Sequence, residues 1–480
     1  MAVTRISLAR KAAFGILLNV ERGAGHSDDL LRGAAVDALA PADRNLVTAL
    51  VLGTLRWQIA LDERIRPWLK RPAAKLDPEI LIALRLGAFQ LLHLDRIPAH
   101  AAIGESVELA KKAGHRFAAG MVNAVLRKLA SGQSYVSGHG RGTHPVDGSS
   151  ADQAAKTTRA SAPAPDLAGE YAHPAWLVDR WERYYGAEAA SAICAHGQTQ
   201  PKLAIRLADP SVEAELAQAG FELAPGELLT AARTVIAGDL TTAQAFREGR
   251  VRIQDEGSQL VGEIAAFCTP KDLDQKVKSI VDACAAPGGK TLILAERNPE
   301  ARIVACEASA QRMAAMQARL AAHSDRIECR LADAAALAED SVHDLALADV
   351  PCSGTGTLGR NPEIRHRLRA EDLPRQGERQ RAILHAALRA VRSGGCVVYS
   401  TCSLEPEENE QVVAAVLVEN SGARQVSLAD CLERMQASGV LAGHAAERLA
   451  QCLTPEGALH LLPGVLGTDG FFVALIERSA

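Results

Sequence analysis

The alternation of apolar runs and helical stretches after about residue 251 is the feature that most limits how this chain can fold. Each apolar run is long enough for one strand, and most are separated by turn residues and a stretch with helical periodicity. This rhythm predicts an α/β fold with a mostly parallel, doubly wound sheet, because parallel strands need crossover connections. Ligands bind beyond the carboxyl ends of the strands in such sheets. The predicted strands cover residues 278–283, 302–306, 326–331, 344–349, 394–401 and 471–476.

The 480 residues are too many for one ordinary domain. Residues 1–132 show helical periodicity only, which predicts an all-α bundle. Residues 133–170 contain too few large apolar side chains to offset the entropy of ordering, so we expect a disordered linker there. Residues 171–250 mix short strand and helix signals and predict a small α/β domain, and residues 251–480 form the domain with the large sheet.

The distribution of charges and cysteines indicates which partners and sites this chain can have. Residues 1–130 hold 19 Lys and Arg against 12 Asp and Glu, which is compatible with a nucleic-acid partner. All ten cysteines follow residue 190 and none forms a C-x-x-C pair, which argues against a zinc site and a disulfide framework. We therefore expect a reduced, cytoplasmic protein without a metal. No run approaches the roughly 18 apolar residues that a membrane span needs.

The stretch VDACAAPGGKT, residues 281–291, predicts a ligand-binding loop between a strand and a helix. Backbone amides of small residues can approach a ligand closely, and a helix N-terminus favours anionic groups. The P-loop pattern fails here, because Cys284 stands where its first glycine is required. A tight strand–helix turn without a ligand is the remaining alternative. The candidate cofactor residues are Cys284, Ala285, Ala286, Pro287, Gly288, Gly289 and Lys290.

Two carboxylates follow the next two predicted strands. Glu307 lies 18 residues beyond Gly289, close to the spacing at which a carboxylate binds ribose hydroxyls in nucleotide-binding units. Taken alone it is as well explained by a solvated charge, but with the loop we favour a cofactor contact. Asp333 could accept from an adenine amino group or simply cap a helix.

Two cysteines lie at the tips of consecutive strands, on the predicted ligand-binding edge. Cys352 follows Asp349 in DVPCSGTGTLGRNP, and Cys402 ends the next strand in YSTCSLEPEENE. A single free cysteine is most often structural, but two between turn residues indicate chemistry. The glycine-rich loop after Cys352 carries Arg360 and Arg365, which suit phosphate groups.

These motifs, with RIQDEGSQL and TDGFFVALIER, resemble the S-adenosylmethionine-dependent RNA cytosine-C5 methyltransferases of the NOL1/NOP2/Sun family. The resemblance covers residues 251–480 and implies a Rossmann-like class I methyltransferase domain. Residues 171–250 are similar to that family's small RNA-recognition-like domain, and residues 1–132 to its NusB-like RNA-binding bundle. The three-part architecture resembles the bacterial enzymes that methylate cytosine(967) of 16S rRNA.

The resemblance implies a role for each candidate residue. Cys402 would attack C6 of the base, Cys352 would serve the later β-elimination, and Asp349 would hydrogen-bond the base near N3, with Lys290 in the same region. S-adenosylmethionine would be held by residues 284–290 with Glu307 and Asp333, and by Asp349 beside its methionine end. A thiolate at Cys402 requires the glutamates of residues 405–410 to point away from it, and we expect them to begin the next helix.

The resemblance also implies the partner, 16S rRNA or a small-subunit precursor, and we expect a monomer. Three alternatives stay open. The same chemistry on tRNA or another rRNA site fits the motifs equally. A non-enzymatic NusB-like RNA-binding or antitermination factor would be expected to lack Cys402 or the cofactor loop. A methyltransferase for proteins or exocyclic amines would carry an N-P-P-Y-type loop, where this chain has Asp349-Val350-Pro351-Cys352.

Overall fold

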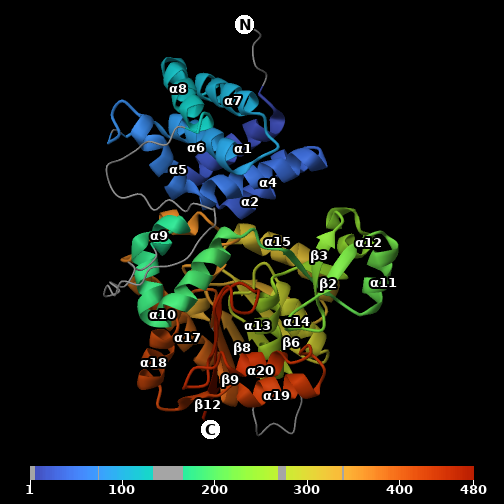
Figure 1. Ribbon diagram of the computed structural model, residues 1–480. Coiled ribbons are helices and arrows are strands. Elements are labelled where there is room, and N and C mark those ends of the chain that lie inside the picture. The colour runs from blue at the N-terminus through green and yellow to red at the C-terminus, as the bar shows by residue number, and fades with distance from the viewer. Residues whose placement is uncertain (1–5, 74, 133–165, 269–276, 338–339, 480) are drawn as a thin grey trace, which may run out of the picture. The chain divides into compact units, whose positions relative to one another are not determined.

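The computed structural model describes residues 6–73, 75–132, 166–268, 277–337 and 340–479 (Figure 1). The chain forms two compact units, residues 1–181 and residues 182–480, and each is considered by itself. The first unit is all-α, as predicted. The second contains two sheets, a small antiparallel one and a large, mostly parallel one.

The first unit is a bundle around one buried helix, α6 (Pro78–His93). Helix α6 is apolar on nearly every side, and most of its side chains lie in the core. A buried ion pair between Arg10 and Glu105 (2.9 Å) adds to the core, and Gln90 of α6 accepts from Arg10 Nε at 2.6 Å. The other main helices are α1 (Leu8–Glu21), α4 (Pro41–Arg56), α5 (Gln58–Ile65), α7 (Ala99–Lys112) and α8 (Ala119–Ala130).

The predicted linker is shorter at its carboxyl end than the sequence suggested. Residues 133–165 lie outside the described residues. Residues 167–170, predicted to be disordered, form the short helix α9 (Leu167–Glu170). Asp166 caps this helix by accepting from the Gly169 amide at 3.0 Å, and Leu167 is buried. A side-chain cap and one buried apolar residue are therefore enough to order the end of a polar segment.

The small sheet of the second unit follows α10 (Ala175–Gln198). Its four strands have the order β2-β3-β1-β4 and pair antiparallel, which confirms the predicted small α/β fold. Helix α11 (Ser211–Gln218) packs beside them, with Val212 and Leu216 buried against β1. The strands are β1 (Leu203–Leu207), β2 (Glu222–Pro225), β3 (Ala232–Ala237) and β4 (Val251–Ile253).

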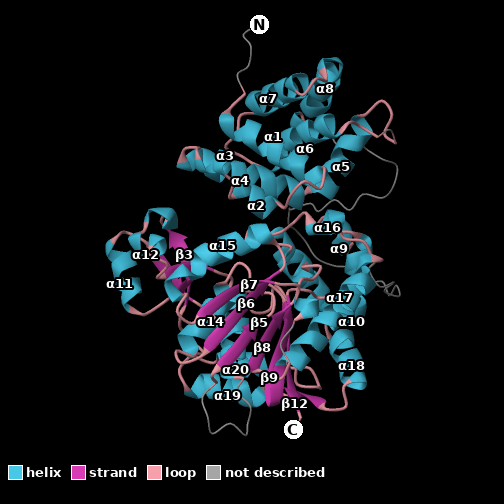
Figure 2. Ribbon diagram, turned by 180° about the vertical axis from the view of Figure 1, so that it is seen from behind, coloured by secondary structure: helices cyan, strands magenta, loops and turns pink. Residues whose placement is uncertain are grey.

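The large sheet has the strand order β10-β12-β9-β8-β5-β6-β7, with β11 paired to β12 (Figure 2). The five strands from β9 to β7 are parallel, and β12 is antiparallel to its neighbours. All six predicted strands are present, which confirms the doubly wound, mostly parallel sheet. They are β5 (Ser279–Asp282), β6 (Arg302–Glu307), β7 (Ile327–Leu331), β8 (His343–Asp349), β9 (Val391–Thr401) and β12 (Phe471–Arg478). The sheet also contains β10 (Ala423–Val426) and β11 (Leu459–Leu461), which the sequence analysis did not predict.

Helices cover both faces of the large sheet, so its central strands are apolar on both sides. In β8, Leu345 and Leu347 belong to one core, and Ala346 and Ala348 belong to the core on the other face. The covering helices are α13 (Glu256–Phe267), α14 (Gly289–Arg297), α15 (Ala310–Leu320), α17 (Asp372–Ala390), α18 (Glu410–Glu419), α19 (Ala429–Ala437) and α20 (Ala445–Ala450).

Strand register places the functional motifs on one edge. Asp282, the last residue of β5, pairs with Leu347 of β8, and Asp349, the last residue of β8, pairs with Ser400 of β9. Parallel strands end on the same side, so the loops after β5, β8 and β9 lie next to one another.

Candidate active site

The loop between β5 and α14 is held in place by its own backbone. The Ala285 amide donates to the Cys306 carbonyl of β6 at 2.8 Å, and the Gly288 amide donates to the Ala285 carbonyl at 2.7 Å. Gly288 has a φ of 98°, a left-handed conformation that glycine adopts at no steric cost. Helix α14 then begins at Gly289.

A pocket opens above this loop. Its lining includes most of the predicted cofactor residues together with several that the sequence analysis did not single out. The lining residues are Arg252, Ile253, Gln254, Ser258, Asp282, Cys284, Ala285, Ala286, Pro287, Gly289, Lys290, Arg319 and Asp349.

The pocket suits an organic ligand with amino and hydroxyl groups. Asp282 lies almost fully buried at its base, where Oδ2 accepts from Thr291 Oγ1 at 2.7 Å and Oδ1 has no hydrogen-bond partner of good geometry among the described residues. Burial raises the pKa of Asp282 to about 7, although the Thr291 hydrogen bond opposes this shift. The loop of residues 284–289 forms one side of the pocket with small side chains, so that its backbone can approach a ligand, and larger side chains complete the wall.

The two further carboxylates differ in their surroundings. Glu307 ends β6 and is only 6% exposed; its Oε1 accepts from the Ser309 amide at 2.7 Å. Arg312 connects it to the loop, because its guanidinium lies 3.3 Å from Glu307 Oε2 and donates to the Ala286 carbonyl at 2.8 Å. Asp333 is exposed, and it caps a short 3-10 helix by accepting from the Ala335 amide at 3.0 Å. This contact is the helix cap that the sequence analysis gave as the alternative to a cofactor contact.

The two predicted thiols meet at the neighbouring strand ends. The Sγ atoms of Cys352 and Cys402 are 3.3 Å apart, and both residues are partly exposed. The Gly356 amide donates to the Cys402 carbonyl at 2.9 Å, which joins the two loops. The hydrogen bond with Cys402 and burial together raise the pKa of Cys352 well above its ordinary value, and the charge of Glu408 adds to the effect.

A partly buried ion pair connects the thiols to the cofactor pocket. Lys290 Nζ donates to Asp349 Oδ2 at 2.8 Å and to Ser258 Oγ at 2.9 Å, and Ser400 Oγ donates to Asp349 Oδ1 at 2.8 Å. Burial alone would lower the pKa of Lys290, but the Asp349 carboxylate and the nearby Cys402 raise it above its ordinary value. The site therefore presents an ammonium group beside the predicted nucleophile.

The glutamates behind Cys402 do not all point away, contrary to the prediction. Glu410 begins α18 as expected, but Glu405 and Glu408 are fully buried in the segment before it. The Glu408 carboxylate reaches back to both thiol loops, where it accepts hydrogen bonds from Ser353 and Ser403. These hydrogen bonds offset the cost of burying Glu408, because a carboxylate that leaves water needs donors in the protein.

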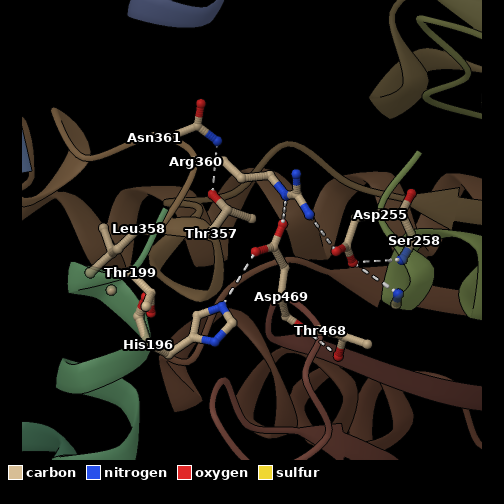
Figure 3. A network of polar contacts seen from close by, with 12 residues as sticks. His196, Thr199, Asp255, Ser258, Thr357, Leu358, Arg360, Asn361, Thr468 and Asp469 are labelled. Atoms are coloured by element: carbon tan, nitrogen blue, oxygen red, sulfur yellow. Dashed lines mark hydrogen bonds and ion pairs between the residues drawn. The ribbon is translucent and has the colours of Figure 1, made fainter. Parts of the chain in front are cut away.

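The two arginines of the glycine-rich loop do not lie free for phosphates, and that prediction is wrong. Arg360 Nε donates to Asp469 Oδ2 at 2.6 Å and its Nη2 donates to Asp255 Oδ2 at 2.8 Å, while His196 lies 3.8 Å from Asp469 (Figure 3). Arg365 is 2% exposed and donates to a backbone carbonyl. Arg360 thus connects the loop after Cys352 to the start of α13 and to the segment before β12.

Sequence reasoning missed the polar partners of the candidate catalytic residues. Ser258 and Gln254 lie in the RIQDEGSQL motif, which was recognised but given no role. Ser400 precedes Cys402 by two residues on β9, so its side chain shares the strand's carboxyl end. The cluster of glutamates in residues 405–410 is the sequence feature that could have indicated Glu408, but such a cluster also fits the start of a helix.

In the part of the chain that the structure describes, no group of three or more His, Cys, Asp or Glu side chains is arranged to hold a metal ion. No described helix is both long and apolar enough to cross a membrane.

Comparisons with known proteins agree along the chain. Residues 269–477 match the family described as 16S rRNA methyltransferase RsmB/F, residues 7–131 match the NusB family, and residues 173–233 match the ferredoxin-like domain of the RsmF/B-like methyltransferases. The probable ribosomal RNA small subunit methyltransferase B of Bacillus subtilis is 31% identical over 98% of both chains. The ribosomal RNA small subunit methyltransferase B of Pseudomonas putida is 31% identical over 93% of both chains. The crystal structure of PH0851 has the same fold, with a TM-score of 0.74 and 22% identity over 99% of both chains.

Proposed function

Because the chain belongs to the RsmB/F family of 16S rRNA methyltransferases, we propose that it methylates C5 of cytosine(967) in 16S rRNA through a covalent Cys402–C6 adduct. The observation that carries this proposal is the meeting of two thiols 3.3 Å apart beside the Lys290–Asp349 ion pair, at the rim of the cofactor pocket. The methyl donor would be S-adenosylmethionine, which supplies an electrophilic methyl group when bound.

The first step is the attack of the Cys402 thiolate on C6 of the cytosine. C5 of the free base is a poor nucleophile, and forming the S–C6 bond turns the ring into an enamine whose C5 can accept the methyl group. Asp349 would hydrogen-bond the base near N3, where the exocyclic amino group can donate, and Lys290, which contacts Asp349, would supply positive charge where the adduct becomes negative. The base must leave its stack to reach the thiol.

The second step restores the aromatic ring. The C5 proton passes to Cys352, the S–C6 bond breaks, and Cys402 leaves as a thiolate. The 3.3 Å separation of the two sulfur atoms places an acceptor for this proton beside the bond that breaks. The two thiols thus divide nucleophilic attack and elimination between them.

The cofactor contacts would come from the loop and the neighbouring strand ends. Residues 284–290 would approach it through backbone amides, Glu307 would accept from the ribose hydroxyls, and Asp333 would accept from the adenine amino group. Asp349 would lie beside the methionine end, where Lys290 already contacts it.

We propose the same division of the chain that the sequence suggested. Residues 1–132 form an RNA-binding bundle, residues 171–250 a small RNA-recognition-like domain, and residues 251–480 the methyltransferase domain, acting together as a cytoplasmic monomer. The substrate is 16S rRNA or a small-subunit precursor, and tRNA is the substrate to be compared with it.

A denaturing gel of the Cys352→Ala variant tests the proposal. The variant is incubated with unmodified 16S rRNA and S-adenosylmethionine, and we expect a protein–RNA band that survives denaturation, because attack proceeds and elimination does not. The band must disappear when Cys402 is also changed to Ala. An adduct with tRNA and none with 16S rRNA would show that tRNA is the substrate. No adduct with either RNA, in a variant that binds the cofactor, would contradict the covalent mechanism.

A further inference from the structure

Glu408 is a buried carboxylate that the proposed reaction leaves without a role. It is 0% exposed, and among the described residues no Lys, Arg or His side chain forms an ion pair with it. A buried charge without a counter-charge is costly, so its retention at an active site needs a reason.

Four neutral donors surround this carboxylate. Oε1 accepts from the Ser353 amide at 2.8 Å and from Gln380 Nε2 at 2.9 Å, and Oε2 accepts from the hydroxyl groups of Ser353 and Ser403. Both carboxylate oxygens therefore have two hydrogen-bond partners each.

The position of these donors relates Glu408 to the thiols. Ser353 directly follows Cys352, and Ser403 directly follows Cys402. One carboxylate therefore binds the residue after each sulfur, and the two hydroxyl oxygens lie 3.0 Å apart, parallel to the 3.3 Å contact of the sulfur atoms. Gln380 extends this clamp by also donating to the Pro351 carbonyl at 3.0 Å.

We propose that Glu408 is a positioning residue that fixes the spacing of the two thiols and keeps the shared proton on Cys352, so that Cys402 is the thiolate. The inference rests on the proposed function for its catalytic consequence but not for its electrostatic one. Glu408 accepts two hydrogen bonds from Ser353, the neighbour of Cys352, and one from Ser403, the neighbour of Cys402, so its charge acts more strongly on Cys352. The titratable groups around the pair are Lys290, Asp349, Tyr399 and Glu408.

The same charge serves both halves of the reaction. At the start, Cys352 holds the proton and Cys402 attacks C6 as a thiolate. Attack moves that negative charge onto the ring, and methylation of C5 discharges it. Cys352 then releases its proton to water and becomes the base that takes the proton from C5. The S–C6 electron pair then returns to Cys402, so the pair ends with the proton on Cys352 as it began. A neighbouring anion makes the Cys352 thiolate more basic and favours this transfer.

The test measures Cys352 directly, in the full chain with Cys402→Ala, so that one thiol of the pair remains. The pH profile of Cys352 alkylation by iodoacetamide is followed by peptide mass spectrometry, with and without Glu408→Gln. We expect Glu408→Gln to move the midpoint at least about one pH unit lower, as removal of a nearby like charge does. Glu410→Gln, which removes a carboxylate two residues away from the clamp, leaves the midpoint in place. An unmoved midpoint in a folded Glu408→Gln protein overturns the proposal.

A second variant keeps the test decisive if Glu408→Gln does not fold. Ser353→Ala removes one donor from the carboxylate and leaves its charge less neutralised, so the Cys352 midpoint stays or moves higher. A midpoint that moves lower contradicts the proposal. Neither measurement needs RNA. If the midpoint shifts as expected but no Cys402-dependent RNA adduct forms, the electrostatic inference stands and the proposed function fails. If the adduct forms and the midpoint does not move, the proposed function stands and the electrostatic inference fails.

Discussion

Two regions of one sheet edge are held in different ways. On the cofactor side, at the ends of β5 and β6, backbone hydrogen bonds such as Ala285 to Cys306 fix a loop of small residues. On the thiol side, at the ends of β8 and β9, buried side chains do this work, with Thr401 donating to Asn409 at 2.6 Å in addition to the Glu408 clamp. Many small residues can supply a backbone amide, but each buried side-chain donor leaves an unpaired partner when it is lost. We therefore expect single substitutions on the thiol side to cause larger losses of stability or activity than substitutions on the cofactor side, and to affect mainly the thiol loops.

The largest expected effect is that of Cys402→Ala, which tests whether methylation can be lost on the thiol side while the cofactor side still binds S-adenosylmethionine. We expect Cys402→Ala to lower kcat for 16S rRNA methylation by on the order of 10³-fold or more, because removal of a nucleophile removes the covalent route. The Kd for S-adenosylmethionine, measured by calorimetry, should stay within twofold, since Cys402 does not line the cofactor pocket.

The matched control for this variant is Cys329→Ala, a partly exposed cysteine in β7 away from the thiol pair. It should retain full turnover. Undiminished methylation by Cys402→Ala would contradict the assignment of the nucleophile.

The second prediction concerns the stability of the thiol side. Arg360→Met leaves Asp255 and Asp469 buried without their cation, and we expect a loss of about 3 kcal/mol in the free energy of unfolding. Burial and the charge of Asp469 raise the pKa of Asp255, while Arg360 opposes this shift, so the loss should be smaller at acidic pH, where Asp255 can take up a proton. Thermal unfolding at pH 5 and pH 8 measures both effects.

Arg369→Met is the control, because Arg369 is an exposed arginine of the same segment with only a 4.0 Å contact to Glu371. It should change stability by less than about 0.5 kcal/mol. Unchanged stability of Arg360→Met at both pH values would show that the two ion pairs of Arg360 do not stabilise this side of the sheet edge.

The difference between the two sides also explains what the sequence could predict. The strands, the loop of residues 284–290 and the convergence of Cys352 with Cys402 follow from local motifs and from the rule that parallel strands end together. The roles of Glu408 and Arg360 do not, because their partners lie far away in the chain: Ser353 is 55 residues from Glu408 and Asp469 is 109 residues from Arg360. A charged residue in a polar segment looks solvated until its distant partners are known.

The third prediction uses the raised pKa of Asp282 on the cofactor side. The folded protein holds a proton on Asp282 up to about pH 7, whereas the unfolded chain loses it near its ordinary pKa of 3.8. Stability contributed by this group is thus present below pH 4 and is lost as pH rises through 7, by about 1.4 kcal/mol per pH unit between these values.

Asp282→Asn removes this titration and keeps an acceptor for Thr291. The difference in unfolding free energy between variant and wild type should therefore shift in favour of the variant by about 2 to 3 kcal/mol from pH 5 to pH 7, without ligand. Thermal unfolding across this range measures the shift. A constant difference would mean that Asp282 is ionised throughout.

The smallest expected effect tests whether the cofactor side depends on backbone conformation. Gly288→Ala places a Cβ at a φ of 98°, 3.3 Å from the Leu320 side chain, and should cost about 1 kcal/mol. Because that strain falls in the loop itself, we expect the Kd for S-adenosylmethionine to rise about fivefold with kcat nearly unchanged. Gly394→Ala is the control, since Gly394 also has a positive φ of 73° but has open space around it and lies in β9 before the buried residues. It should lower stability by a similar amount and leave the Kd unchanged. An equal loss of affinity in both variants would show that general destabilisation, and not the shape of the loop, governs cofactor binding.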